Sequence, residues 1–254
     1  MMAIKLVAID VDDTLITDEL VIPPACQKAI REARAQGVEV VLATGRMFRA
    51  TAPYMRELGL DGPVILYNGA LIQTAAGEII DHRPIPLDLA REIIRFCQVH
   101  HLHLNVYLAD RLYVAEINEH AKYYEAMTGV EAEPVGDLLE FVTQEPTKLL
   151  IVGYEDELLP WRERLTREYA GKLEVTRSKP RYIEIMKQGI SKGNALQTLA
   201  EKLGVARSEV MAIGDGFNDL PMLEWAGVGV AVANAPDLVK AKVDWIAPSN
   251  EEAG

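Results

Sequence analysis

The sequence predicts an α/β protein with a Rossmann-like parallel-sheet core and an inserted α+β cap domain. Apolar strands and amphipathic helices alternate along the first third of the chain, a pattern typical of a parallel sheet covered on both faces. The rhythm changes in the middle, and the alternation returns in the tail. We therefore expect a core formed by residues 1–81 and 189–254 and a cap formed by residues 82–188.

Five segments carry the alternation in the first third. They are a strand at 5–9, a helix at about 24–36, a strand at 38–43, a helix at 47–58 and a strand at 63–69. Pro23 and Pro24 stand at the start of the first helix and Gly37 just past its end, as expected for helix boundaries. The strands are continuous apolar runs, which indicates that they are buried.

The middle of the chain combines hairpins with helices. Residues 69–85 predict a hairpin that turns at Gly77, and residues 102–116 predict two strands around Ala109 and Asp110. Helices are predicted at 87–101 and at about 157–169, and the stretches 147–153 and 173–186 lie before and after the second of them. We expect these elements to form a layer of their own.

The tail completes the sheet that the first third begins. It predicts a helix at 191–204 with Ser191 as N-cap, a strand at 210–215, and short strands at 227–233 and 244–248 around a helix at 236–243. A sheet begun before the middle segment and completed after it makes that segment an inserted lid.

Composition and charge limit the possible partners. The chain has 254 residues, is 49% hydrophobic and 25% charged, and suits an ordinary globular protein of one or two domains. A net charge of -12 argues against nucleic acid as a partner. No apolar run approaches the ~20 residues of a membrane span, and the N-terminus lacks the pattern of a signal peptide. Cys26 and Cys97 are expected to be packed thiols in a reducing compartment, so we expect a cytoplasmic location. The sequence carries no signal for an oligomeric state.

Four motifs place reactive side chains at strand ends or helix starts. They are DVDDTL (10–15), ATGR (43–46), SKGNAL (191–196) and GDGFNDLPML (214–223). Ligands of a parallel sheet bind outside the carboxyl ends of its strands. We therefore expect convergence there of Asp10, Asp12, Thr44 and Asp215, with Lys192 entering from a helix start.

The crowded aspartates of the first motif allow two interpretations. Carboxylates at the end of a buried strand repel one another unless a cation lies between them, but an aspartate also shapes turns. The four motifs together, in this order and spacing, resemble the haloacid dehalogenase superfamily of phosphohydrolases. Within it they resemble the Cof-type phosphatase branch, which has a large α/β cap inserted between the second and third motifs. The resemblance covers essentially the whole chain and favours the cation site.

This resemblance implies a Mg²⁺-dependent phosphohydrolase that acts on small phosphorylated metabolites, such as sugar phosphates, through an aspartyl-phosphate. It makes Asp10 the nucleophile and Asp12 the general acid and base. The expected metal ligands are the carboxylates of Asp10 and Asp215 and the backbone carbonyl of Asp12. Thr44 is expected to donate its hydroxyl and Gly45 its amide to the phosphoryl oxygens. Lys192 is expected to neutralise the charge of those oxygens.

Other positions matched by the resemblance support the site. Asn218 is expected to orient the phosphate or the metal, Asp219 to pair with Lys192 or with metal-bound waters, and Asn68 to lie near the substrate. Asp13 stands where the family often has glycine, and we interpret it as a structural residue in left-handed backbone. The chain ends at SNEEAG, where relatives usually continue into a last helix, so the tail is either short or incomplete.

Three other classes of function compete with this hypothesis. A phosphomutase of the same superfamily would use the same two aspartates. A response-regulator receiver would be about half this length and lack the cap, and a non-catalytic phosphate-binding regulatory protein would not need Asp12.

Several other residues carry polar or aromatic side chains. The residues His100, His101 and His103 are interpreted as a solvated helix end. Tyr123, Tyr124 and Met127 are interpreted as packing residues. Arg46 and Arg49 could reach phosphate, although Arg49 is equally well interpreted as a solvated helix residue. The stretch with Arg181, Tyr182, Glu184 and Lys187 is either a substrate-facing surface of the cap or an ordinary strand face. The sequence does not identify the substrate.

Overall fold

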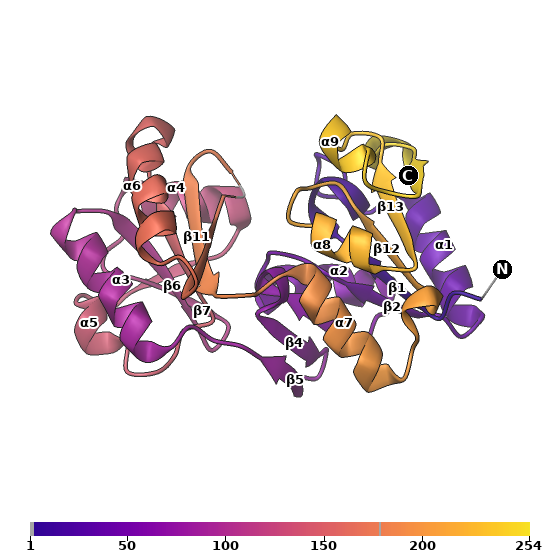
Figure 1. The fold of residues 1–254 in the computed structure, drawn as a ribbon, viewed down its shortest axis with the longest axis horizontal. Coiled ribbons are helices and arrows are strands. Elements are labelled where there is room, and N and C mark those ends of the chain that lie inside the picture. The colour runs from indigo at the N-terminus through magenta and orange to yellow at the C-terminus, as the bar shows by residue number, and fades with distance from the viewer. Residues whose placement is uncertain (1–2, 178) are drawn as a thin grey trace. The chain divides into compact units, whose positions relative to one another are not determined.

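The computed structural model describes residues 3–177 and 179–254. Its contacts divide the chain into a core unit, residues 1–46, 51–81 and 191–254, and an inserted unit, residues 47–50 and 82–190 (Figure 1). Ser178, within the stretch 173–186, lies outside the described residues, as do Met1 and Met2. The core unit contains a parallel sheet, and the inserted unit contains a mainly antiparallel sheet. The protein is therefore of the α/β class with an additional antiparallel sheet.

The core unit is built on a parallel sheet whose strand order is β14-β13-β12-β1-β2. The strands are β1 (Leu6–Ile9), β2 (Glu39–Leu42), β12 (Val210–Gly214), β13 (Val228–Val232) and β14 (Trp245–Ala247). All four pairings are parallel, and Leu6 of β1 is opposite Glu39 on one side and Val210 on the other. The carboxyl ends of β1 and β12 therefore lie side by side.

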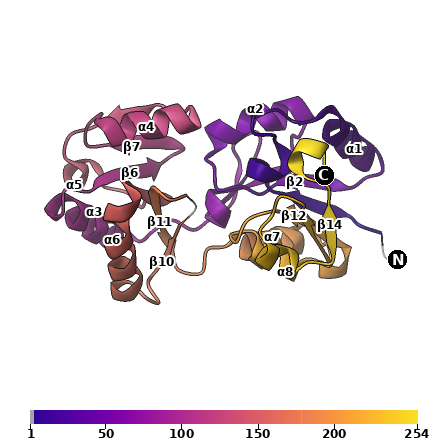
Figure 2. The same ribbon diagram turned by 90° about the horizontal axis from the view of Figure 1, so that it is seen from above.

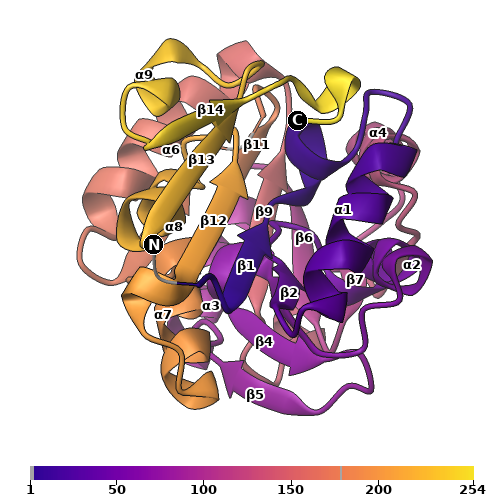
Figure 3. The same cartoon turned by 90° about the vertical axis from the view of Figure 1, so that its right-hand side faces the viewer.

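Helices cover both faces of this sheet. They are α1 (Pro24–Ala35), α2 (Phe48–Leu58), α7 (Lys192–Leu203), α8 (Leu220–Trp225) and α9 (Asp237–Lys240). Figures 2 and 3 show α1 and α2 on one side of the sheet and α7 and α8 on the other. Leu199 of α7 and Met222 of α8 share one buried apolar cluster with Leu6 of β1. Burial of these apolar faces stabilises the core unit.

The strand expected at 63–69 does not simply extend the parallel sheet. β3 (Pro63–Leu66) meets the end of the preceding strand in one parallel bridge, between Ala43 and Ile65. It then pairs antiparallel with β4 (Leu71–Thr74), which is followed by β5 (Ile79–His82). Residues 67–69 form a turn rather than strand, because Asn68 and Gly69 adopt φ angles of 55° and 105°. The expected turn at Gly77 is present, with a φ angle of 88°.

The inserted unit contains a six-stranded sheet of order β10-β11-β9-β6-β7-β8. Its strands are β6 (His103–Leu108), β7 (Arg111–Val114), β8 (Ala132–Pro134), β9 (Lys148–Val152), β10 (Leu173–Thr176) and β11 (Tyr182–Lys187). Its helices are α3 (Leu87–Val99), α4 (Glu119–Thr128), α5 (Leu138–Phe141) and α6 (Glu155–Glu168). The strand β8 and the helix α5, three and four residues long, were not predicted.

The two faces of the inserted sheet differ in chemistry. Leu104, Val106 and Ile185 point to the face that packs in an apolar cluster with α3 and α6. Several of the alternate positions are buried but polar, namely His103, Asn105, Lys148 and Glu184. The helix α4 contacts β6 and β9, and Figure 2 shows it across the sheet from α3 and α6. Polar side chains are thus enclosed within this unit.

The interpretation of the histidine cluster as a solvated helix end is wrong for His103. The helix α3 ends at Val99, and the chain reverses through His101, whose φ angle is 54°. His103 then begins β6 and is 8% exposed, because strand alternation turns its side chain toward the polar face. Ser191 does cap α7, as predicted, by accepting a hydrogen bond from the Asn194 amide. Across residues 3–177 and 179–254, every helix is too short or too polar to cross a bilayer.

Candidate active site

Asp10 is the first residue after β1, at the carboxyl end of the central strands. The chain then enters a tight turn, Val11–Leu15, in which Asp13 has a φ angle of 59°. Asp13 therefore adopts the left-handed backbone expected of it, and its carbonyl accepts a hydrogen bond of 2.7 Å from Asn234. The turn fixes the direction in which the acidic motif leaves the sheet.

Lys192 joins two of the predicted site residues. As the first residue of α7, it places its Nζ 2.5 Å from Oδ1 of Asp10 and 2.6 Å from Oδ1 of Asp219. The Lys192 side chain is 1% exposed. A buried ammonium in contact with two carboxylates is held in one position by charge-assisted hydrogen bonds.

Asp215 follows β12 and lies beside this group. Its Oδ1 accepts a hydrogen bond of 2.9 Å from the Thr14 hydroxyl. The other oxygen of Asp219, Oδ2, accepts hydrogen bonds from the amides of Asp215 and Gly216. Asp219 is thus engaged on both oxygens and ties the strand end to the lysine.

The three carboxylates form a compact oxygen cluster. Asp10, Asp215 and Asp219 each offer an oxygen, and the three oxygens lie within 4.8 Å of one another. Burial and the charge of Asp219 raise the pKa of Asp10 well above its usual range, and they raise that of Asp215 to about 6. Burial alone would lower the pKa of Lys192, but the neighbouring Asp10 and Asp219 raise it.

The charge balance of this cluster fits a bound divalent cation. One ammonium faces three carboxylates, so the cluster has an excess of negative charge. Hard oxygen donors of this kind are the ligands that Mg²⁺ prefers, and a cation among them would favour the ionised carboxylates. The residues present therefore suit a magnesium ion.

Asp12 lies apart from the lysine and is paired with Arg46. Arg46 donates from Nε to Oδ2 at 2.8 Å and from Nη2 to Oδ1 at 2.5 Å. Burial would lower the pKa of Arg46, but the hydrogen bonds and charge of Asp12 raise it above its usual value. The sequence suggested that Arg46 could reach phosphate but gave no sign of this pairing, since the two residues are 34 positions apart.

The remaining predicted site residues of the core unit also lie together. The Thr44 hydroxyl accepts a hydrogen bond from the Arg46 amide, and the Thr44 carbonyl accepts one from the Asn68 amide. Asn218 donates to the side chain of Asn68 at 3.1 Å. A Cβ atom on Gly45 would lie 3.0 Å from Oδ1 of Asn68, so a larger residue would press on that side chain.

Glu184 and Arg181 of the inserted unit have structural partners. Glu184 forms a buried ion pair with Lys148, with 3.0 Å between Nζ and Oε1. Arg181 donates to the Gly153 carbonyl and lies over the ring of Tyr123, 3.8 Å from its centroid.

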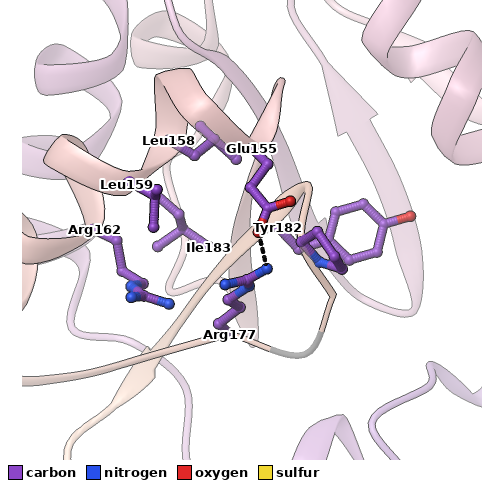
Figure 4. Close-up of a pocket in the computed structure, with 8 residues that line it drawn as sticks. Glu155, Leu158, Leu159, Arg162, Arg177, Tyr182 and Ile183 are labelled. Carbon is purple, nitrogen blue, oxygen red and sulfur yellow. Dashed lines mark hydrogen bonds and ion pairs between the residues drawn. The ribbon is translucent and has the colours of Figure 1, made fainter.

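A small hollow beside α6 is not a substrate site. Figure 4 shows Tyr182 among its lining side chains, with an ion pair between Arg177 and Glu155. Its volume of about 10 Å³ leaves room for about one water. This hollow is therefore too small for a metabolite.

Comparisons with known proteins agree on one family. Residues 7–254 match the family model of the haloacid dehalogenase-like hydrolases. The 5-amino-6-(5-phospho-D-ribitylamino)uracil phosphatase YcsE of Bacillus subtilis is 34% identical over 253 residues, covering 99% of this chain and 92% of the relative. The pyridoxal phosphate phosphatase YbhA of Escherichia coli is 30% identical over 267 residues, covering 98% and 95%.

A solved structure matches over the same length. A haloacid dehalogenase-like hydrolase from Bacteroides thetaiotaomicron superposes with a TM-score of 0.92 at 31% identity. The match covers 99% of this chain and 96% of that one. It therefore includes both the core unit and the inserted unit.

Proposed function

Since this chain belongs to the haloacid dehalogenase-like hydrolases, as a phosphatase of the Cof-type branch, we propose that it hydrolyses phosphate monoesters of small metabolites with Mg²⁺. The observation that carries this proposal is the buried cluster in which Asp10 faces both Lys192 and Asp215. The substrates in the names of YcsE and YbhA are small phosphorylated compounds, which supports the same substrate class here.

Asp10 is the nucleophile of the proposed reaction. Its carboxylate attacks phosphorus, the bond to the leaving oxygen breaks, and an aspartyl-phosphate forms. Lys192, 2.5 Å from Asp10, offsets the negative charge of the phosphoryl oxygens. Mg²⁺, held by Asp10, Asp215 and the backbone carbonyl of Asp12, would supply further positive charge for the phosphate dianion.

Asp12 is the general acid and base. Its side chain is 44% exposed, so a leaving group can approach it from solvent. It gives a proton to the leaving oxygen and later takes one from the water that cleaves the aspartyl-phosphate. The hydroxyl of Thr44 and the amide of Gly45 donate to the phosphoryl oxygens in this proposal.

The polar neighbours of the cluster position these groups. Asp219 fixes Lys192 and the turn after β12 through both of its oxygens. Asn218 and Asn68, joined by a hydrogen bond, are proposed to orient the phosphate. We propose that the inserted unit, which contains the cap expected at residues 82–188, selects the substrate.

A panel of phosphorylated metabolites tests this function. The full-length protein is incubated with Mg²⁺ and each ester, and both free phosphate and organic products are measured. We expect free phosphate from small sugar phosphates or similar esters. An isomerised phosphate ester without free phosphate would indicate a phosphomutase instead. Binding of esters without turnover would overturn the proposal in favour of a regulatory protein.

A further inference from the structure

Arg46 occupies both oxygens of the Asp12 carboxylate. Two donors of one planar guanidinium meet two oxygens of one carboxylate, at 2.8 and 2.5 Å, which is the strongest geometry available to this pair. Among the described residues, Arg46 is the side chain from which Asp12 accepts hydrogen bonds. The orientation of Asp12 therefore depends on this arginine.

The position of Arg46 itself is fixed by three other segments. Its amide donates to the Thr44 hydroxyl, and its carbonyl accepts a hydrogen bond from the Tyr67 amide. Its guanidinium lies 5.4 Å from the centre of the Tyr54 ring, and its side chain is 21% exposed. The guanidinium of Arg46 is thus held in place by its own contacts, and it orients the more exposed side chain of Asp12 through two hydrogen bonds.

We infer that Arg46 is a positioning residue that holds Asp12 where it can exchange a proton with the leaving group. This inference rests on the proposed role of Asp12 as general acid and base. Such a group must lie within hydrogen-bond reach of the leaving oxygen, and misplacement by about 1 Å can cost roughly 10²-fold in rate.

The pair of hydrogen bonds from Arg46 to Asp12 suits the stage of the reaction at which Asp12 has lost its proton. When the bond between phosphorus and the leaving oxygen breaks, the proton of Asp12 moves to that oxygen. Asp12 is then a carboxylate with two acceptor oxygens, which is the species that Arg46 holds with two donors. Arg46 thereby stabilises the product of proton transfer and orients Asp12 for the attacking water.

Leaving groups of different acidity test the inference. Phenyl phosphate and p-nitrophenyl phosphate are similar in size, but phenolate is the poorer leaving group and depends more on protonation. We expect Arg46→Met to lower kcat/KM for phenyl phosphate by about tenfold or more and for p-nitrophenyl phosphate by less than about threefold. Arg46→Lys keeps the charge without the fork and should fall between wild type and Arg46→Met. The matched control is Arg56→Met, an exposed arginine of the helix α2 that follows Arg46, which should leave both rates unchanged.

A double-mutant cycle separates positioning from a general structural effect. In an Asp12→Asn background, Arg46→Met should change kcat/KM for phenyl phosphate by less than about threefold, because the group that it positions is gone. Equal losses on both esters, or losses that multiply in the double variant, overturn the inference. Should Arg46→Met fail to fold, the same comparisons with Arg46→Lys decide the question.

Failure of the proposed function gives a different result. Wild-type protein that hydrolyses neither these two esters nor any ester of the metabolite panel with Mg²⁺ removes both the function and the inference. An Asp12→Asn variant with wild-type kcat/KM on phenyl phosphate shows that Asp12 is not the acid, whatever Arg46 does. A third outcome is a large loss of kcat/KM in Asp12→Asn while the Arg46 variants lose kcat/KM equally on both esters. That outcome removes the inference about Arg46 and leaves the proposed function in place.

Discussion

The Nζ atom of Lys192 lies 2.5 Å from Oδ1 of Asp10, and the two side chains are 1% and 7% exposed. Residues separated by 182 positions thus form an ion pair that water scarcely reaches. The pair connects the end of β1 to the start of α7. Its integrity therefore matters to the fold as well as to the proposed chemistry.

Removal of the ammonium should destabilise the core unit. Lys192→Met leaves the buried carboxylates of Asp10 and Asp219 without their cation, which should lower the free energy of unfolding by about 3–5 kcal/mol. Turnover should also be lost. Chemical denaturation measures the first effect, with Lys202→Met, an exposed lysine of the same helix, as control. Unchanged stability in Lys192→Met would contradict the contribution assigned to this pair.

The two leading aspartates should fail in different ways. Asp10→Asn removes the nucleophile, so acid-quenched protein should contain no phosphorylated enzyme and turnover should cease. Asp12→Asn should lower turnover by about 10²- to 10⁴-fold. It should still bind Mg²⁺, because the proposed ligand at that position is the backbone carbonyl. Rapid-quench labelling and calorimetric Mg²⁺ titration measure these results, and wild-type hydrolysis by Asp10→Asn would refute the mechanism.

Removal of metal should abolish activity and lower thermal stability. Mg²⁺ that binds only the folded protein raises Tm by mass action, so EDTA should reverse the increase. Asp215→Asn removes one of the clustered carboxylates and should weaken the response of Tm to Mg²⁺. Asp18→Asn, an exposed aspartate, is the control. Full turnover in EDTA would exclude a required metal.

The buried pair of the inserted unit should contribute to stability rather than to substrate choice. Glu184→Leu removes the carboxylate that faces Lys148 and should cost about 3–5 kcal/mol, whereas Glu184→Leu with Lys148→Met should recover most of that loss. Glu133→Leu breaks the exposed pair with Arg111 and should cost at most about 1 kcal/mol. Denaturation curves give the ranking. Glu184→Leu with unaltered stability and a changed substrate preference would indicate instead that Glu184 contacts the substrate.

His103 should make stability depend on pH. Burial lowers its pKa to about 4, the hydrogen bond that its Nε2 donates to Oδ1 of Asn105 raises it less, and His120 of α4 is the titratable group that faces it. The unfolded chain binds a proton near pH 6.5 and the folded chain does not, so stability should rise with pH between about 4 and 6.5.

Two histidine variants test the pH dependence. His103→Asn should flatten the slope of the unfolding free energy across this window, and His101→Asn, at an exposed site, should leave it intact. Denaturation at several pH values measures both slopes. Equal slopes in wild type and His103→Asn would show that another group titrates.

The sequence predicted the fold class and the residues of the acidic cluster because both depend on local patterns. Apolar runs followed by Asp10, Thr44 and Asp215 indicate strand ends, and the strand ends of a parallel sheet share one edge. The roles of these residues stay proposals, since they depend on ligands. The end of the strand expected at 63–69 was wrong, because the chain turns at Asn68 and Gly69, a dipeptide typical of turns, after the apolar run that predicted the strand.

Contacts between distant polar residues could not be predicted. Nothing in the spacing of Asp12 and Arg46, or of Lys148 and Glu184, distinguishes a pair from two solvated charges. Burial of His103 depends on the strand register and on the helix α4 that covers it, which are tertiary properties. Such polar positions require the structure.

The strand order of the core unit also has a consequence for synthesis on the ribosome. Leu6 of β1 pairs with Val210 of β12, so one neighbour of the first strand leaves the ribosome about 200 residues after it. At about 5–20 residues per second, this delay is roughly 10–40 s. During that interval one edge of β1 has no native partner, and Asp10 has neither Lys192 nor Asp219 beside it. The nascent chain therefore carries an apolar strand with one unpaired edge for most of its translation, and such an edge can pair with another chain.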